Sequence, residues 1–219
     1  MSDKYQAILF DMDGTLIDSM DYHVIAWTGA FEEMGYNPGK QVFYLNEGVK
    51  HPVTVRERLA EMGIHNPDEE LVTKIFTRKR EIFENIVKVK PNDGVMELLD
   101  WLKGKAKLGI VTGGVRNVVE KVVRENFDGY FDIVVDYDST EKGKPDPDPF
   151  AYGAKLCDLP KENILAIENA PTGVKSAIAA GLTCWAVCTT LESEYLSEAH
   201  RVFKDFHELK KALVDEKLI

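Results

Sequence analysis

The sequence predicts an α/β fold in which a parallel sheet is covered by helices and a helical cap is inserted after the first strand. Short apolar runs of β-type residues alternate with helical patterns along the chain, which is typical of parallel sheets. Residues 11–107 separate the first two runs, far more than one crossover helix requires. With 219 residues, the chain is long enough for one substantial core that carries a smaller insertion.

Five runs are expected to form the strands of the sheet. They are Ala7–Phe10, Leu108–Val111, Ile133–Val135, Ile164–Ile167 and Cys184–Val187. Between the strands, the apolar residues from Val95 to Leu102 keep a helical spacing.

The segment between the first two strands has helical patterns throughout. Apolar positions from Val24 to Met34 keep a spacing of three and four, and a second stripe runs from Leu71 to Val87. Asn66 followed by Pro67 is expected to start the second of these helices. The expected units are a core of residues 1–16 and 89–219 and a cap of residues 17–88.

Composition and charge exclude several classes of partner. The formal net charge is −10 and no long run of Lys and Arg breaks it, so a nucleic-acid partner is not expected. The start lacks the apolar core of a signal peptide, and no apolar stretch is long enough to cross a membrane. We therefore expect a cytoplasmic protein with reduced cysteines and no membrane partner; the sequence does not indicate its oligomeric state.

Four polar segments follow the predicted strands, where open parallel sheets bind their ligands. These segments are Asp11–Thr15, Thr112–Gly114, Gly143–Pro145 and Glu168–Asn169. Each segment alone is a weak signal, but their appearance in order at four successive strand ends indicates one catalytic site.

Asp11 and Asp13 are two positions apart, so their carboxylates can point the same way and repel unless a proton or a cation joins them. A magnesium ion would align a phosphate against one carboxylate, which attacks phosphorus, while the other donates a proton to the leaving oxygen. We assign Asp11 as nucleophile and Asp13 as acid/base. The alternative for this motif alone is a solvated turn with Gly14 at a positive φ.

The second and third segments offer groups for a phosphate. The hydroxyl of Thr112 can reach a phosphoryl oxygen, and Gly113 and Gly114 let the backbone approach it; the alternative for Thr112 is a helix cap. Lys144 is suited to meet a developing negative charge, unless it is an ordinary exposed lysine.

The fourth segment completes a metal site. The Glu168 carboxylate can join the oxygen ligands that Asp11 and the carbonyl of Asp13 provide, and Asn169 stands beside it. The alternative is that Glu168 and Asn169 cap the helix that begins at Pro171.

Asp11–Ser19, with the sequence DMDGTLIDS, resembles the first motif of the haloacid dehalogenase-like hydrolases. Thr112, Lys144 and the segment at Glu168 resemble motifs two to four in the same order, and the likeness covers residues 7 to about 181. The resemblance implies a Rossmann-like core, a helical cap, Mg²⁺ and a phosphoric monoester hydrolase that works through an aspartyl-phosphate.

Asp18–His23, with Trp27 one turn later, resembles the branch of β-phosphoglucomutases and phosphoglycolate phosphatases. Gly114 and Val115 precede Arg116, and Gly48–Pro52 lacks the Ser-Arg pattern of a mutase, which favours hydrolysis.

A further departure concerns the metal. Most relatives have an Asp where Asn169 stands, so Glu168 is expected to be the charged ligand. Arg116, Lys50 and His23 are candidate substrate contacts. The alternative for the two basic residues is an exposed position that only keeps the protein soluble, and the alternative for His23 is packing within its helix.

The predicted function is therefore a magnesium-dependent phosphatase acting on a small phosphorylated metabolite. The alternative is a sugar-phosphate mutase with the same intermediate. A phospho-accepting signalling module is a third hypothesis, which the inserted cap disfavours.

Overall fold

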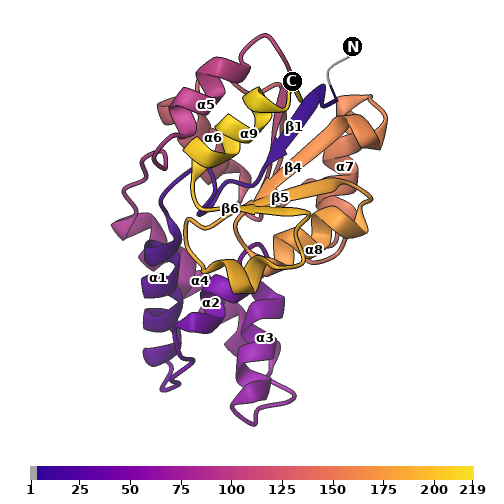
Figure 1. Cartoon of the computed structure of the whole chain (residues 1–219). Coiled ribbons are helices and arrows are strands. Elements are labelled where there is room, and N and C mark those ends of the chain that lie inside the picture. The colour runs from indigo at the N-terminus through magenta and orange to yellow at the C-terminus, as the bar shows by residue number, and fades with distance from the viewer. Residues whose placement is uncertain (1–3) are drawn as a thin grey trace.

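The computed structural model describes residues 4–219 and has the predicted α/β fold (Figure 1). Six parallel strands form one sheet in the order β3-β2-β1-β4-β5-β6, the strand order of a Rossmann-like sheet. The strands are β1 (Ala7–Phe10), β2 (Lys107–Val111), β3 (Ile133–Val135), β4 (Ile164–Glu168), β5 (Thr183–Val187) and β6 (Arg201–Phe203). The first five match the predicted runs to within one residue, and β6 was not predicted.

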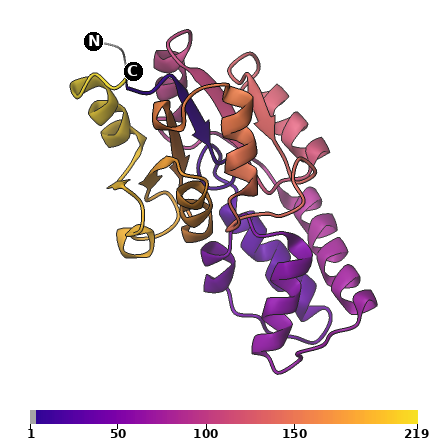
Figure 2. The ribbon, with the colours of Figure 1, turned by 90° about the vertical axis from the view of Figure 1, so that its right-hand side faces the viewer.

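Helices cover both faces of the sheet (Figure 2). Along β1, Ile8 and Phe10 pack into one apolar cluster while Ala7 and Leu9 pack into another, as expected from the alternation of side chains along a strand. The first cluster includes side chains of α5 (Val95–Leu102), α6 (Arg116–Asn126) and α9 (Phe206–Asp215), and the second those of α7 (Asp148–Cys157) and α8 (Pro171–Ala179). Because both faces are covered, the strands are almost continuously apolar.

The chain between β1 and α5 forms a separate helical insert with its own apolar cluster around Trp27, Phe31 and Phe43. Its helices are α1 (Met20–Glu32), α2 (Gln41–Leu45), α3 (His51–Glu61) and α4 (Glu69–Ile86). They lie beyond one end of the sheet, at the bottom of Figure 1. This confirms the predicted helical insertion, while the division at residues 17 and 88 stays a prediction.

One expected helix start was wrong. α4 begins at Glu69 rather than at Pro67, because the carboxylate of Asp68 accepts a hydrogen bond from the backbone N–H of Leu71 at 2.6 Å. Asn66 and Pro67 belong to the preceding loop. An aspartate in this position satisfies a free N–H group of the first turn, which neither earlier residue does here.

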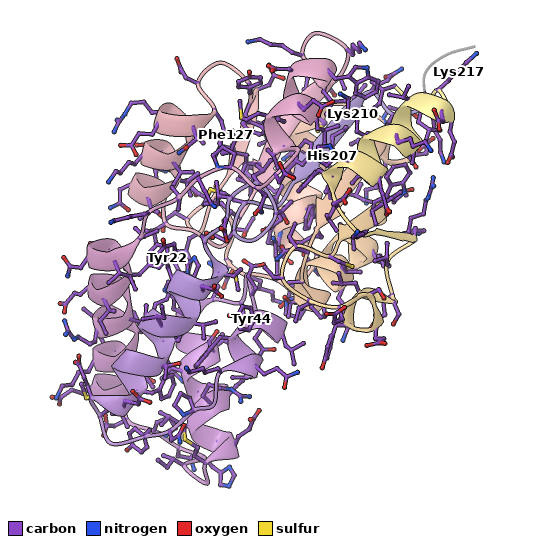
Figure 3. All side chains as sticks on the ribbon, turned by 60° about the vertical axis from the view of Figure 1, so that its left-hand side comes forward. Tyr22, Tyr44, Phe127, His207, Lys210 and Lys217 are labelled. Carbon is purple, nitrogen blue, oxygen red and sulfur yellow. The ribbon has the colours of Figure 1, made fainter. Side chains whose placement is uncertain are left out.

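The two connections to the insert run side by side at the carboxyl end of β1. The backbone N–H of Asp18 donates to the carbonyl of Lys90 at 3.0 Å, and Ile17 forms an antiparallel bridge with Pro91. In Figure 3, Tyr22 and Tyr44 lie on the insert, whereas Phe127 and His207 lie on the core. Within residues 4–219, no helix combines the length and the apolar character needed to cross a bilayer.

Candidate active site

Side chains from successive strand ends meet at the edge of the sheet that faces the insert. Asp11 follows β1, Glu168 ends β4, and Lys144 lies in the loop after β3. The Lys144 ammonium lies 2.6 Å from Asp11 Oδ1 and 2.6 Å from Glu168 Oε1, and all three side chains are almost completely buried. Thr112, which follows β2, directs its hydroxyl toward Asp13 Oδ2 at 3.4 Å. The four predicted segments are therefore together in space.

The turn after Asp11 depends on a glycine. Gly14 has a φ of 85°, and a Cβ added there would lie 2.3 Å from Asn169 Nδ2. The expected positive φ is present, but the turn is buried against β4 rather than solvated, since Thr15 is fully buried and donates to Asn169 Oδ1 at 2.8 Å. Asn92 holds the same turn by donating to the carbonyls of Gly14 and Thr15.

Burial and charge set the protonation of the central groups. Burial raises the pKa of Asp11 to about 8; Lys144 opposes this rise, whereas repulsion from Glu168 and Asp13 adds to it. Burial alone would lower the pKa of Lys144, but attraction to Asp11, Glu168 and Glu47 outweighs it and raises that pKa above its usual value. Lys144 therefore stays charged and draws the carboxylates together.

Asp13 has a different environment. Its Oδ1 accepts hydrogen bonds from Ser19 Oγ at 2.7 Å and from His23 Nε2 at 3.0 Å. Burial opposes ionisation of Asp13, but His23, Ser19 and the charge of Lys79 outweigh it, and the pKa of Asp13 falls to about 2. Asp13 is therefore a carboxylate in this arrangement.

His23 links Asp13 to Lys79 of α4. Lys79 Nζ lies 3.0 Å from His23 Nδ1, and an ammonium can only donate, so Nδ1 accepts and Nε2 carries the proton that reaches Asp13. Burial and the charge of Lys79 lower the pKa of His23, although Asp13 opposes this. His23 holds Asp13 by the hydrogen bond from Nε2, and a protonated His23 also lowers the pKa of Asp13 by its charge.

The carboxylates of Asp11, Glu168 and Glu47, a residue of the insert, each place an oxygen within 4.8 Å of the others. Burial, together with the charge of Asp11, raises the pKa of Glu47 well above its usual value. In the described part of the chain, Asp11 Oδ2 and Glu47 Oε2 are buried without a hydrogen-bond partner. Hard oxygen donors with unused acceptor capacity fit a divalent cation such as Mg²⁺.

Glu168, the last residue of β4, and Asn169, which follows it, are both expected metal ligands but differ in availability. Glu168 belongs to the carboxylate cluster, and its Oε2 also accepts from the backbone N–H groups of Asn169 and Ala170. The side chain of Asn169 is occupied at both ends, because Oδ1 accepts from Thr15 and Nδ2 donates to Thr190 at 3.0 Å. This geometry favours Glu168 over Asn169.

A cavity lies between the insert and the core, beside Asp13. Of the residues predicted to contact substrate, Gly113, Gly114 and His23 line this cavity. Lys50 does not: its ammonium donates to the carbonyls of Tyr137 at 3.1 Å and Thr140 at 2.6 Å.

Arg116 is also outside the cavity lining. Its guanidinium pairs with Asp136 at 2.9 Å and its side chain is 61% exposed. Both Lys50 and Arg116 therefore make protein contacts here, and any contact of theirs with substrate stays a prediction.

The sequence reasoning did not single out Ser19, Lys79 or Glu47. A signal existed for Lys79, since Ile75, Lys79 and Phe83 are spaced four apart and place a lysine on the buried stripe of α4. Glu47 gave no comparable signal, because it lies in a loop that reaches the core only through the tertiary fold.

The chain matches the family model of the haloacid dehalogenase-like hydrolases over residues 5–181. The chain belongs to this family. Membership confirms the superfamily predicted from the motifs, and relatives named as phosphatases add that the enzyme is of the phosphoric monoester hydrolase class.

Named relatives refine this assignment. Validoxylamine A 7′-phosphate phosphatase of Streptomyces hygroscopicus subsp. limoneus is 29% identical over 208 residues, which cover 94% of this chain and 96% of the relative. Phosphorylated carbohydrates phosphatase of Thermotoga maritima is 27% identical, covering 81% and 82%. A solved structure from Bacteroides vulgatus, named as a β-phosphoglucomutase, has a TM-score of 0.89 and 30% identity and covers 99% of this chain and 90% of its own. The predicted branch of the superfamily is thereby confirmed.

Proposed function

We propose that this haloacid dehalogenase-like protein is a magnesium-dependent phosphatase that cleaves a small phosphorylated metabolite through an aspartyl-phosphate on Asp11. The observation that carries the proposal is the contact of Lys144 with both Asp11 and Glu168 at 2.6 Å, beside Thr112 and Asp13. The curated relatives named as phosphatases of phosphorylated compounds support the same substrate class.

In this proposal, Asp11 attacks phosphorus in line with the leaving oxygen, and the P–O bond to the leaving group breaks. Lys144 and the Thr112 hydroxyl offset charge on the phosphoryl oxygens. When bound, Mg²⁺ would be held by Asp11, Glu168 and the carbonyl of Asp13, and would neutralise phosphoryl charge and orient the phosphate.

Asp13 transfers protons in both half-reactions. It protonates the leaving oxygen and then, as a carboxylate, takes a proton from the water that attacks the aspartyl-phosphate. With a pKa of about 2, Asp13 is ready for the second role, while the first requires that it gain a proton. His23, whose Nε2 lies 3.0 Å from Oδ1, can pass a proton to Asp13 from Nε2 while its Nδ1 takes one from the Lys79 ammonium 3.0 Å away, so that the imidazole stays neutral.

The helical insert acts as a cap in this proposal. Asp11 is completely buried beneath the loop that holds Gly48, so the insert must move away to admit a phosphate and return to exclude water.

The three free cysteines support a reducing compartment, in keeping with the expected cytoplasmic location.

The test is hydrolysis of p-nitrophenyl phosphate with and without Mg²⁺. Asp11→Asn is expected to abolish Mg²⁺-dependent cleavage while circular dichroism stays that of the wild type. Asp18→Asn, a change of the same kind at a side chain that is 55% exposed, is the matched control and should stay active. Residual activity of Asp11→Asn comparable to wild type would refute the assigned nucleophile.

A mutase is the second candidate, favoured by the likeness to the B. vulgatus protein. Incubation with a hexose 1-phosphate and a bisphosphate activator separates the two functions. Free phosphate indicates the phosphatase, and a 6-phosphate product indicates the mutase. Release of many phosphate ions per protein molecule would exclude a signalling module, which binds one phosphoryl group per molecule and does not turn over.

A further inference from the structure

Glu47 is an insert residue whose carboxylate lies inside the catalytic core. It belongs to the loop between α2 and α3, its surface is only 8% exposed, and its Oε2 has no hydrogen-bond partner among residues 4–219. Burial of a carboxylate oxygen is unfavourable unless a donor or a cation joins it. A donor or a cation is therefore needed to stabilise the buried carboxylate of Glu47.

The surrounding groups identify what Glu47 can bind. Lys144 donates to Asp11 Oδ1 and to Glu168 Oε1, and backbone N–H groups donate to Glu168 Oε2. The buried oxygens of this cluster that accept nothing are Asp11 Oδ2 and Glu47 Oε2. If all three carboxylates are ionised, as ligands of a cation are, they and the ammonium carry a net charge of 1 − 3 = −2, which one divalent cation would neutralise.

The spacing of the cluster also suits a cation. One oxygen from each of its three carboxylates lies within 4.8 Å of the other two. Ligands on opposite sides of a magnesium ion are about 4 Å apart, so a small adjustment would bring these oxygens onto one ion.

The residue beside Glu168 does not provide another charged ligand. Asn169 is neutral, and its side chain already exchanges hydrogen bonds with Thr15 and Thr190. The third carboxylate of the cluster, besides those of Asp11 and Glu168, is therefore that of Glu47 from the insert.

Contacts that do not involve its own carboxylate hold Glu47 in place. Lys50 donates to two carbonyls of the core, and Thr172 Oγ1 donates to the carbonyl of Glu47. Gly48 has a φ of 78°, and a Cβ there would lie 2.6 Å from Lys144 Cδ, so the loop lies directly on the lysine. The backbone is fixed while the carboxylate remains free to bind.

We propose that Glu47 is a ligand of the catalytic cation, supplied by the helical insert and acting where Asn169 provides no charge. The inference rests on the proposed magnesium dependence. The cation then joins Asp11 of the core to Glu47 of the insert, so that loading the metal favours the closed arrangement. A substrate phosphate, which is also anionic, displaces Glu47 when it enters.

The test measures Mn²⁺ binding to the whole substrate-free protein, by electron paramagnetic resonance of free Mn²⁺ and by calorimetry. Glu47→Gln removes the charge, and Glu47→Asp keeps the charge but withdraws the carboxylate by one methylene. Both are expected to weaken binding at least tenfold. Glu57→Gln, at an exposed residue of α3, is the matched control and should stay within twofold of wild type.

Glu47→Asp separates ligation from a field effect. If Glu47→Asp binds Mn²⁺ as tightly as wild type, Glu47 acts only through its charge and the inference is wrong. Equal affinities of Glu47→Gln and Glu57→Gln would overturn it as well. Circular dichroism confirms that each variant is folded before its affinity is compared.

Hydrogen exchange gives a second readout that does not depend on activity. Mg²⁺ should slow amide exchange of residues 46–50 in the wild type and leave it unchanged in Glu47→Gln; equal slowing in both would contradict the link between insert and core. Wild-type affinity in the Glu47 variants, together with normal phosphate release, overturns this inference alone. Loss of the proposed function would instead appear as Asp11→Asn retaining activity.

Discussion

Lys79 is a charged side chain that the fold buries at a measurable cost. It is 2% exposed on α4, and burial lowers its pKa from 10.5 to about 8, although attraction to Asp13 opposes this. At about 1.36 kcal/mol per pKa unit, this difference of 10.5 − 8 = 2.5 units amounts to about 3 kcal/mol against the folded state at pH 7. Lys79→Met should remove that cost.

Favourable contacts of Lys79 reduce the expected gain. Its Nζ lies 5.0 Å from the ring centroid of Trp27 and 5.1 Å from that of Phe83, contacts worth roughly 0.5–1 kcal/mol each. The variant should therefore be more stable than wild type by about 1–2 kcal/mol at pH 7, measured by urea denaturation. Lys74→Met, at an exposed position of the same helix, is the control and should change little.

The pH dependence identifies the cause. The unfolded chain keeps the Lys79 proton up to about pH 10.5, whereas the folded chain loses it near pH 8, so the cost is complete below pH 8 and disappears above 10.5. The gain in Lys79→Met should accordingly shrink by about 1–2 kcal/mol between pH 7 and pH 9.5. A variant less stable than wild type at pH 7, or a gain that does not change with pH, would refute this reasoning.

Two further predictions concern the contacts of Asp13 and of the turn that follows it. His23→Gln removes a partner that lowers the pKa of Asp13, so the acidic limb of the pH–rate profile should move to higher pH and kcat should fall by roughly 10²-fold; an unchanged limb would contradict the assigned contact. Gly14→Ala must adopt a φ of 85° with its Cβ 2.3 Å from Asn169 Nδ2, so the free energy of unfolding should fall by about 2–4 kcal/mol. Gly35→Ala is the control: nothing lies within 4 Å of its Cβ, so its free energy of unfolding should fall by less.

The sheet could be predicted from the sequence because its strands are apolar on both faces. β1 and β4 are buried along their whole length, and a continuous apolar run marks such a strand directly. β6 gave no such signal, since Arg201–Phe203 has three residues, lies at the edge of the sheet and buries only Phe203 fully. Short edge strands depend on their neighbour rather than on their own composition.

Part of the site followed from topology in the same way. Once the strands are parallel, their carboxyl ends share one edge, so Asp11, Thr112 and Glu168 had to be close. Sequence alone could not show that Arg116 pairs with Asp136 or that Lys50 binds backbone carbonyls. The sequence does not distinguish a basic side chain that binds substrate from one that pairs with another group of the protein. Their partners are set by loop geometry.

The point of insertion explains why the insert contributes to this site at all. The chain leaves the core directly after Asp11–Asp13 and returns at Pro91, which pairs with Ile17, so both connections lie at the catalytic edge of the sheet. Any helical unit attached there lies over the nucleophile, and its loops can reach the groups at the strand ends. The core motifs therefore predict the chemistry, whereas no core motif specifies the insert side chains that reach the site, Glu47 among them.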